Sequence, residues 1–342
     1  MFLSESQSRP PSVSWPRLLG DVGGTHARFG WQRQAGAEIE QIRVLPVSDY
    51  PDLRAAVESY LELTQLGRPA CGALGMANPV VGDLVAMTNH HWRFSIGDMR
   101  AQLGLHRLLV LNDFTALALA LPHLQASVKV PVGAAPQPAE RATIGLIGPG
   151  TGLGVSGLLP VPGTERWVPI VGEGGHVSLS ASTPEEFAVV EQLRLRYGHA
   201  SAERALSGAG LVDLYHALSR VRGLPSAEIT APAQVMEQAL RDSPSLASEV
   251  LDLFCGFLGS VAGDLALTLG AQGGIYIGGG IVPRMKDRFM QSSFRARFEA
   301  KGRFRLYLQG IPVWLIDAPV SPALLGASLA LSLYDQPEGR AA

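Results

Sequence analysis

The chain reads Gly20-Asp21-Val22-Gly23-Gly24-Thr25 directly after an apolar run and just before a segment in which apolar and polar residues alternate. Ala27, Phe29 and Trp31 are the apolar members of that alternation. The layout predicts a buried strand over 17–20, a tight glycine turn and a returning strand. Backbone N–H groups in such a turn can face an anion without help from a lysine, so the turn is a candidate phosphate site.

The same local order returns in the second half of the chain. An apolar run over 143–147 leads into Gly148-Pro149-Gly150-Thr151-Gly152-Leu153-Gly154, and an alternating run follows over 155–159. We interpret this as a weak internal duplication, with one phosphate turn in each half. The turn also fits the spacing G-x-G-x-x-G, but a dinucleotide fingerprint must open a helix, and this segment alternates and ends at Pro160. A phosphate-binding hairpin is therefore preferred.

The tripeptide Leu111-Asn112-Asp113 ends an apolar strand predicted over 108–111 and opens a helix predicted over 114–121. Proteins of the α/β class place ligand-binding groups at this junction between a strand and a helix. Capping of the helix by Asp113 is the alternative role, and the spacing alone favours it.

Asp21 has two interpretations. A carboxylate beside bound phosphates is where a magnesium ion or its water ligands would sit, but aspartate is also a common turn former. Glu173-Gly174-Gly175-His176 has the Glu-x-x-His spacing of a helical metal pair. Its central glycines disfavour a helix, so a polar loop that binds a ligand is preferred. Glu203, by its local pattern alone, is a solvated helix residue.

The wider pattern predicts an α/β protein with a first domain of order β-β-β-α-β-α. A proline- and alanine-rich stretch over 126–142 is interpreted as a loop or boundary. We expect a flexible extension over 1–17, a small α/β domain over 18–124 plus 317–336, and a large α/β domain over 125–316. Further strands are predicted over 41–47, 71–77, 274–277 and 311–316, and further helices over 50–65, 184–197, 207–221, 245–269 and 322–333.

Composition narrows the class of protein. The 342 residues are 46% hydrophobic and 17% charged, and the balance of 28 basic against 30 acidic residues argues against nucleic-acid or membrane-surface binding. Cys71 and Cys255 lie in apolar surroundings without a CxxC pair, which predicts buried reduced thiols and no structural zinc. The first 16 residues lack an apolar core, so we expect no signal peptide and a cytoplasmic protein.

Seven segments, taken in order, resemble the bacterial glucokinase family of the hexokinase/actin-like ATPase fold, over about 18–328. They are 20–28, 87–90, 111–116, 148–155, 172–177, 201–211 and 278–284. The resemblance implies a two-domain actin-like ATPase (ribonuclease H-like) fold with the active site in an interdomain cleft. It also implies phosphorylation of glucose at the 6-hydroxyl by ATP with Mg²⁺, feeding glycolysis, and a homodimer.

Roles for single residues come from the same resemblance. Asp113 resembles the catalytic base, and Asn112 a residue that holds the sugar. The other residues similar to sugar-binding positions are Glu173, His176 and Glu203. The segment 20–25 matches the first phosphate motif, Gly150-Thr151-Gly152-Leu153-Gly154 the second, and Gly278-Gly279-Gly280 the adenosine-side motif. The chain departs from the family at His26, where many relatives have Asn, and it lacks the cysteine cluster of the zinc-containing sugar kinases.

Three rival functions remain. A kinase for another hexose, such as mannose or an amino sugar, would need the same polar groups. A sugar-sensing regulator would need a DNA-binding module, for which the 19 residues before Gly20, three of them proline, are expected to leave no room. An ATP-binding scaffold would lack the carboxylate of Asp113.

Overall fold

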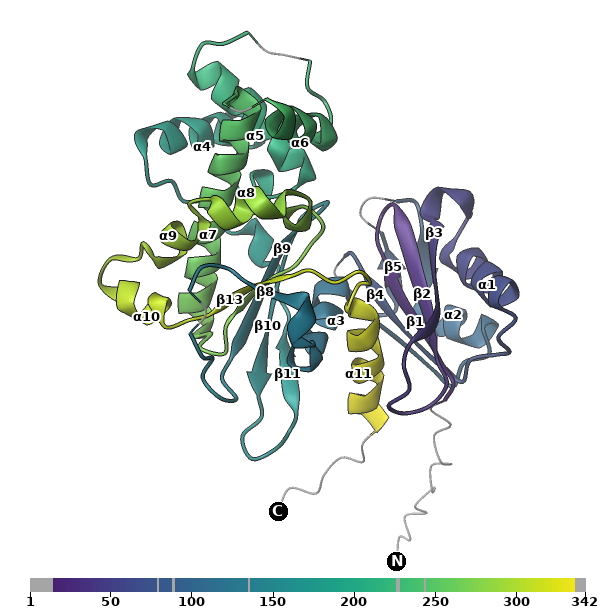
Figure 1. Cartoon of the computed structure of the whole chain (residues 1–342). Coiled ribbons are helices and arrows are strands. Elements are labelled where there is room, and N and C mark those ends of the chain that lie inside the picture. The colour runs from purple at the N-terminus through teal and green to yellow at the C-terminus, as the bar shows by residue number, and fades with distance from the viewer. Residues whose placement is uncertain are drawn as a thin grey trace, which may run out of the picture. The chain divides into compact units, whose positions relative to one another are not determined.

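The computed structural model describes residues 15–78, 80–87, 90–134, 136–225, 228–242 and 244–335. Residues 1–14 of the expected extension, Thr88 and Asn89 of one family-like segment, and position 336 at the end of the expected small domain lie outside these residues. The chain divides into two compact units, which Figure 1 labels by element. Unit 1 is Met1–His123 with Pro319–Ala342, and unit 2 is Leu124–Ala318.

Unit 1 is built on a five-stranded sheet of order β3-β2-β1-β4-β7. The hairpin predicted around the first glycine turn is confirmed, because β1 and β2 are antiparallel, and β4 and β7 then continue the sheet parallel to β1. All residues of β1 and β4 are buried, as expected of central strands covered on both faces. The strands are β1 (Arg17–Val22), β2 (His26–Gln32), β3 (Glu40–Pro46), β4 (Cys71–Met76) and β7 (Arg107–Asn112).

Helices cover both faces of this sheet. On one face α1 (Leu53–Thr64) packs on a core that includes Leu18. On the other face α11 (Ala323–Asp335) packs on a core that includes Leu19, since neighbouring residues of a strand point to opposite faces. The buried Arg17 Nη1 donates to the backbone oxygen of Ser328 at 2.8 Å, which ties the last helix to the first strand.

Unit 1 contains more elements than the predicted order β-β-β-α-β-α. A two-stranded sheet, β5 (Leu84–Ala86) with β6 (Arg93–Ser95), and the helix α2 (Ile96–Gln102) lie between β4 and β7. The strands are three residues long, so they are too short to show an alternation, and the order predicted from the sequence is wrong at this point.

Unit 2 contains a six-stranded sheet of order β11-β10-β9-β12-β13-β8. Its central hairpin, β9 against β10, carries the second glycine turn and was predicted. The stretch 126–142, interpreted as a loop or boundary, is irregular over most of its described residues, but Lys129–Pro131 within it pair antiparallel with β13 as an edge strand. The strands are β8 (Lys129–Pro131), β9 (Ile144–Pro149), β10 (Leu153–Pro160), β11 (Trp167–Ile170), β12 (Ile275–Ile277) and β13 (Val313–Ile316).

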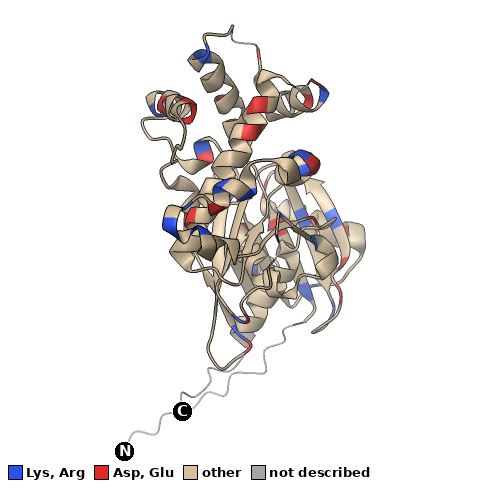
Figure 2. Ribbon diagram, turned by 60° about the vertical axis from the view of Figure 1, so that its left-hand side comes forward, with Lys and Arg blue, Asp and Glu red and all other residues tan. Residues whose placement is uncertain are grey.

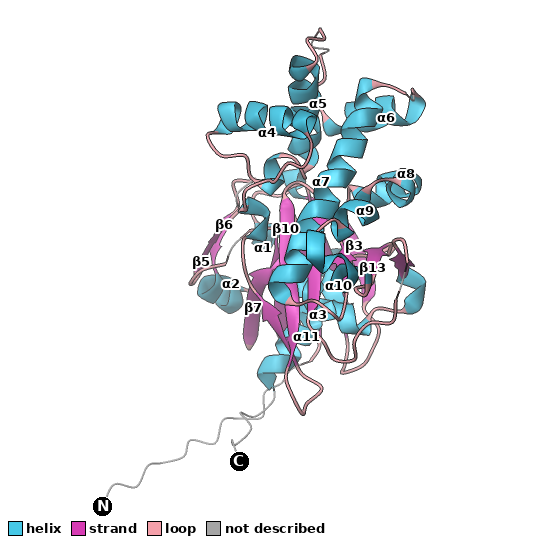
Figure 3. Cartoon of the chain, turned by 90° about the vertical axis from the view of Figure 1, so that its left-hand side faces the viewer, coloured by secondary structure: helices cyan, strands magenta, loops and turns pink. Residues whose placement is uncertain are grey.

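Helices α4, α5 and α6 gather at one end of unit 2, and α7 extends from them toward the sheet (Figures 1 and 3). By length and composition α7 could cross a membrane, but 72% of its most apolar window is buried inside the unit, so it is a core helix. The helices are α4 (Pro184–Tyr197), α5 (Gly208–Val221), α6 (Pro232–Arg241), α7 (Leu246–Leu269), α8 (Lys286–Gln291), α9 (Phe294–Glu299) and α10 (Arg305–Gln309). The predicted 184–197 is confirmed, and α5 and α7 each begin one residue after a capping serine that the prediction included.

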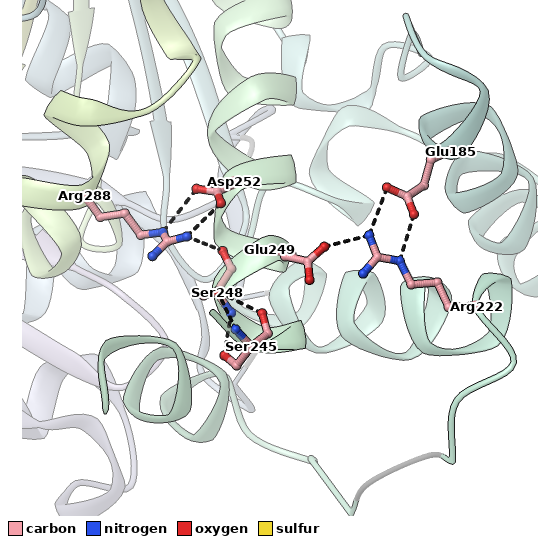
Figure 4. Close-up of polar contacts among 7 residues, drawn as sticks. All are labelled: Glu185, Arg222, Ser245, Ser248, Glu249, Asp252 and Arg288. Carbon is pink, nitrogen blue, oxygen red and sulfur yellow. Dashed lines mark hydrogen bonds and ion pairs between the residues drawn. The ribbon is translucent and has the colours of Figure 1, made fainter. Parts of the chain in front are cut away.

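Ion pairs join the helices of unit 2. Arg222, at the end of α5, donates to Glu185 of α4 at 2.8 Å and contacts Glu249 of α7 at 2.6 Å (Figure 4). These groups are part-exposed, so each pair contributes little to stability in water. Acidic and basic residues are interspersed along the described ribbon, without a long run of either sign (Figure 2).

Candidate active site

The candidate site residues of unit 1 lie at one end of its sheet, where three parallel strands end. The parallel register places Val22 beside Met76 and Met76 beside Asn112, so β1, β4 and β7 end together. The first glycine turn follows β1, and Asp113 follows β7. With about 4.8 Å between neighbouring strands, the two strand ends are roughly 10 Å apart across β4.

Asp113 is the first residue of α3 (Asp113–Ala120), and the capping residue is Asn112. The Asn112 Oδ1 accepts the N–H of Thr115 at 3.1 Å, while Asp113 Oδ1 accepts the N–H of Phe114 at 2.9 Å. The helix cap considered for Asp113 therefore belongs to its neighbour. A helix N-terminus favours negative charge, typically by about 0.3–1 kcal/mol.

A glycine in β4 lets the backbone of Asp113 approach the sheet. A methyl group added at Gly75 would lie 3.3 Å from Asp113 Cα, which is tighter than most such contacts. The position of the carboxylate is thus set by close packing of α3 on β4 as well as by the strand that precedes it.

The first glycine turn is closed by backbone hydrogen bonds. Gly23 N–H donates to the oxygen of His26 at 2.9 Å, and Val47 N–H donates to the oxygen of Thr25 at 3.0 Å. Asp21 is 9% exposed, and its Oδ2 lies 3.4 Å from Nη1 of Arg28. No local motif in the sequence points to this partner, although residues 21 and 28 face each other in the hairpin register and could have been paired by counting from the turn.

The second glycine turn is surrounded by two other predicted motifs, all within unit 2. Gly278 N–H donates to the oxygen of Ile147 at 2.8 Å, at the end of β9. Gly279 has φ 77°, and a methyl group there would overlap the oxygen of Pro149. Gly208 N–H, in the first turn of α5, donates to the oxygen of Gly150 at 2.9 Å. The second phosphate motif and the adenosine-side motif are therefore adjacent.

The predicted sugar-binding residues of unit 2 come from two short 3₁₀ helices. One is η4 (Gly174–His176), so Glu173 and His176 flank a 3₁₀ turn, as the glycines disfavoured an α-helix. It lies directly on β10, because a methyl group at Gly175 would overlap the oxygen of Leu153. Both Glu173 and His176 are exposed.

Glu203 lies in η5 (Ala202–Arg204), which is joined to the same segment by the 2.8 Å bond from Ala202 N–H to the oxygen of Val177. Its Oε2 accepts the N–H of Leu153 at 2.9 Å. The local pattern predicted a solvated helix residue at Glu203. This prediction is wrong, because the carboxylate contacts the second glycine turn.

Arg204, which follows Glu203 in η5, contacts a tyrosine that belongs to a hydrogen-bond network. The guanidinium of Arg204 lies 4.0 Å from the ring centroid of Tyr197. The Tyr197 hydroxyl donates to Oδ2 of Asp213 at 2.6 Å, and Arg196 donates to the other oxygen at 2.6 Å. Burial, followed by the hydrogen bond to Asp213, raises the pKa of Tyr197. Asp213 lies 17 positions from Arg196 and 16 positions from Tyr197, on another helix, and no local pattern in the sequence indicated these contacts.

The residues described here contain no group of three or more His, Cys, Asp or Glu that could hold a metal ion by themselves. Cys71 and Cys255 are both buried, and neither is in a disulfide, as predicted. Desolvation raises the pKa of Cys255 to about 12, so this thiol stays protonated at neutral pH and is not a nucleophile.

Two α/β units, each with a glycine turn in a β-hairpin, and a carboxylate at a strand end define a phosphotransferase of the actin-like ATPase class. The sequence model of the family described as Glucokinase matches residues 18–334. The chain belongs to the glucokinase family, and it is an enzyme that phosphorylates glucose with ATP.

Individual relatives agree. A glucokinase of Aromatoleum aromaticum is 52% identical over 94% of this chain and 96% of its own. A bifunctional protein glk of Burkholderia thailandensis is 49% identical over 93% of this chain, which spans only 48% of that longer protein. The crystal structure of a glucokinase from an Antarctic psychrotroph has 35% identity and a TM-score of 0.81, over 94% of this chain and 99% of that one.

Proposed function

We propose that Asp113 is the base of the glucokinase reaction. The carboxylate accepts the proton of the sugar 6-hydroxyl while that oxygen forms its bond to the γ-phosphorus of ATP, and the bond to ADP breaks. The supporting observation is that β1, β4 and β7 end together, so that only β4 lies between the strand before Asp113 and the strand before the first phosphate turn. A loose phosphoryl transition state requires mainly positioning and charge stabilisation, and these are what fixed strand ends supply.

The other hydroxyls of the same sugar would contact Asn112, Glu173, His176 and Glu203. Carboxylates accept hydrogen bonds from hydroxyls, and amide and imidazole groups can both donate and accept, so this set suits a polyhydroxylated ligand. The segment 20–25 and residues Thr151, Gly152 and Gly154 would bind the phosphates through backbone N–H groups. Gly279 and Gly280 would lie on the adenosine side.

Mg²⁺ fits the first turn as a partner of ATP. The ion is commonly bound by one or two carboxylates together with substrate phosphates and waters, so the single carboxylate of Asp21 is sufficient. Asp21 would hold it through water, with Arg28 fixing the orientation of the carboxylate. When bound, the ion would neutralise charge on the phosphates.

Replacing Asp21 with asparagine is expected to raise the Mg²⁺ concentration for half-maximal rate by about 10-fold, as for other groups that orient a metal's ligands. Rates measured over a Mg²⁺ series at fixed ATP would show this. An unchanged Mg²⁺ dependence would favour the simpler role of a turn former.

Replacing Glu203 with alanine is expected to weaken glucose binding by about 1–3 kcal/mol, because a sugar hydroxyl loses a charged partner. Calorimetry with glucose alone measures this, and affinity for ATP without sugar should change little. If glucose affinity is unaltered, the carboxylate serves only the backbone of Leu153.

Preference for glucose over another hexose is the remaining question of substrate. Comparing kcat/KM for glucose, mannose and glucosamine tests it. A site that hydrogen-bonds a particular sugar hydroxyl strongly disfavours an analogue in which that hydroxyl is missing or points elsewhere.

A cytoplasmic location and a homodimer stay predictions of the family resemblance. Cell fractionation tests the location, and sedimentation of the purified protein tests the oligomeric state.

A further inference from the structure

The second glycine turn contacts Glu203 at two points. The Leu153 N–H donates to Oε2 at 2.9 Å, and a methyl group added at Gly152 would overlap the same oxygen. The carboxylate therefore occupies the space that a side chain at position 152 would fill.

We propose that Gly152 and the Leu153 N–H position the Glu203 carboxylate for the sugar. Gly152 is then a positioning residue on the sugar side, although its motif is that of a phosphate turn. This inference rests on the proposed sugar-binding role of Glu203. It assigns the turn a second role, because the Leu153 N–H donates to the carboxylate of Glu203 and is therefore not available to a phosphate.

Backbone conformation does not explain the glycine at 152. Neither Gly150 nor Gly152 has a positive φ, so both positions could accept an ordinary L-residue. They differ in their surroundings, because a methyl group at Gly150 would meet no atom within 4 Å. The requirement for glycine at 152 is thus the room taken by the carboxylate.

The overlapped atom is the end of a flexible side chain and not backbone. A methyl group at 152 is therefore accommodated by turning the Glu203 carboxylate away, and the fold is kept. Turning it away also breaks the bond to Leu153 and changes the direction in which the carboxylate can accept a hydroxyl. Loss of a correctly aimed charged acceptor typically weakens binding by roughly 5- to 100-fold.

The test is calorimetry of glucose binding without nucleotide, so that any effect on ATP is excluded. Gly152→Ala is expected to bind glucose about 10-fold more weakly than the unmodified protein. Gly150→Ala, the matched change in the same turn, is expected to bind it as tightly as the unmodified protein. In a Glu203→Ala background, Gly152→Ala should weaken binding no further, since its effect passes through the carboxylate.

Glu203→Asp tests the same inference by glucose binding without changing any residue of the second glycine turn. It keeps the charge but withdraws the carboxylate from Leu153 N–H, so glucose binding should weaken by a similar factor. Circular dichroism on each variant identifies any that fails to fold, and Glu203→Asp then decides in place of Gly152→Ala.

The outcomes separate this inference from the function on which it rests. If Glu203→Ala weakens glucose binding but Gly152→Ala and Glu203→Asp do not, the positioning role is wrong and the sugar contact stands. Multiplicative losses in the double variant would also overturn the positioning role. If Glu203→Ala leaves glucose binding unchanged, the sugar contact is wrong and the inference is lost with it.

Discussion

Replacing Asp113 with alanine is expected to lower kcat by about 10²–10⁴-fold, the usual contribution of a positioned acid–base group. The structure leaves helix capping to Asn112, so the change should remove the base without removing the cap of α3. Glucose affinity should fall only modestly. A coupled assay with saturating glucose and ATP measures the effect.

Asp98→Asn is the matched control. Asp98 is also an aspartate in the first turn of a helix, it is exposed, and it lies outside the residues proposed for the site. Its kcat should be unchanged. A folded Asp113→Ala protein with near-normal kcat would mean that another group takes the proton, or that none is needed.

Replacing Gly326 with alanine is expected to destabilise the protein by about 1–3 kcal/mol or more, because it overpacks a helix crossing. A methyl group at this position of α11 would overlap the backbone oxygen of Ala116 in α3. Unlike a side chain, this backbone cannot turn away, so the two helices must separate. The midpoint of urea unfolding should fall, with activity also reduced because α3 begins at Asp113.

The control for this change is Gly97→Ala in α2, where an added methyl group would meet only ordinary contacts of 3.4 Å or more. Alanine favours a helix over glycine by about 0.8–1 kcal/mol, so the expected sign is opposite. Equal midpoints for Gly326→Ala and the unmodified protein would show that the helices separate without cost.

Local signals predicted much of this fold. The range of α4 and the starts of α5 and α7 follow from helical spacing of apolar residues and from a capping residue such as Ser207. Edge strand β8 could not be found in this way. It is three residues long and ends in proline, and its pairing partner β13 lies far away in sequence.

The candidate site, like the fold, could be predicted from local signals only in part. Asp113 and the glycine turns lie at strand ends that local alternation locates, whereas assigning them to a sugar and to ATP depended on the family resemblance. The contact of Glu203 with Leu153 joins residues 50 positions apart, and Tyr197 reaches Asp213 from another helix. Such contacts arise only when the chain is folded, so no pattern of spacing in one sequence reveals them.

The return of the C-terminal helix to the first sheet has a consequence for synthesis. Unit 2 is one continuous segment, Leu124–Ala318, while unit 1 needs both ends of the chain. At about 5–20 residues per second, the ribosome makes that segment over about 10–40 s. During this time Leu19 and the other apolar residues that α11 covers in the finished protein stay open to water or to a chaperone. The second unit is thus free to fold first, and α3, which begins at Asp113, gains its packing against α11 only after α11 has been made.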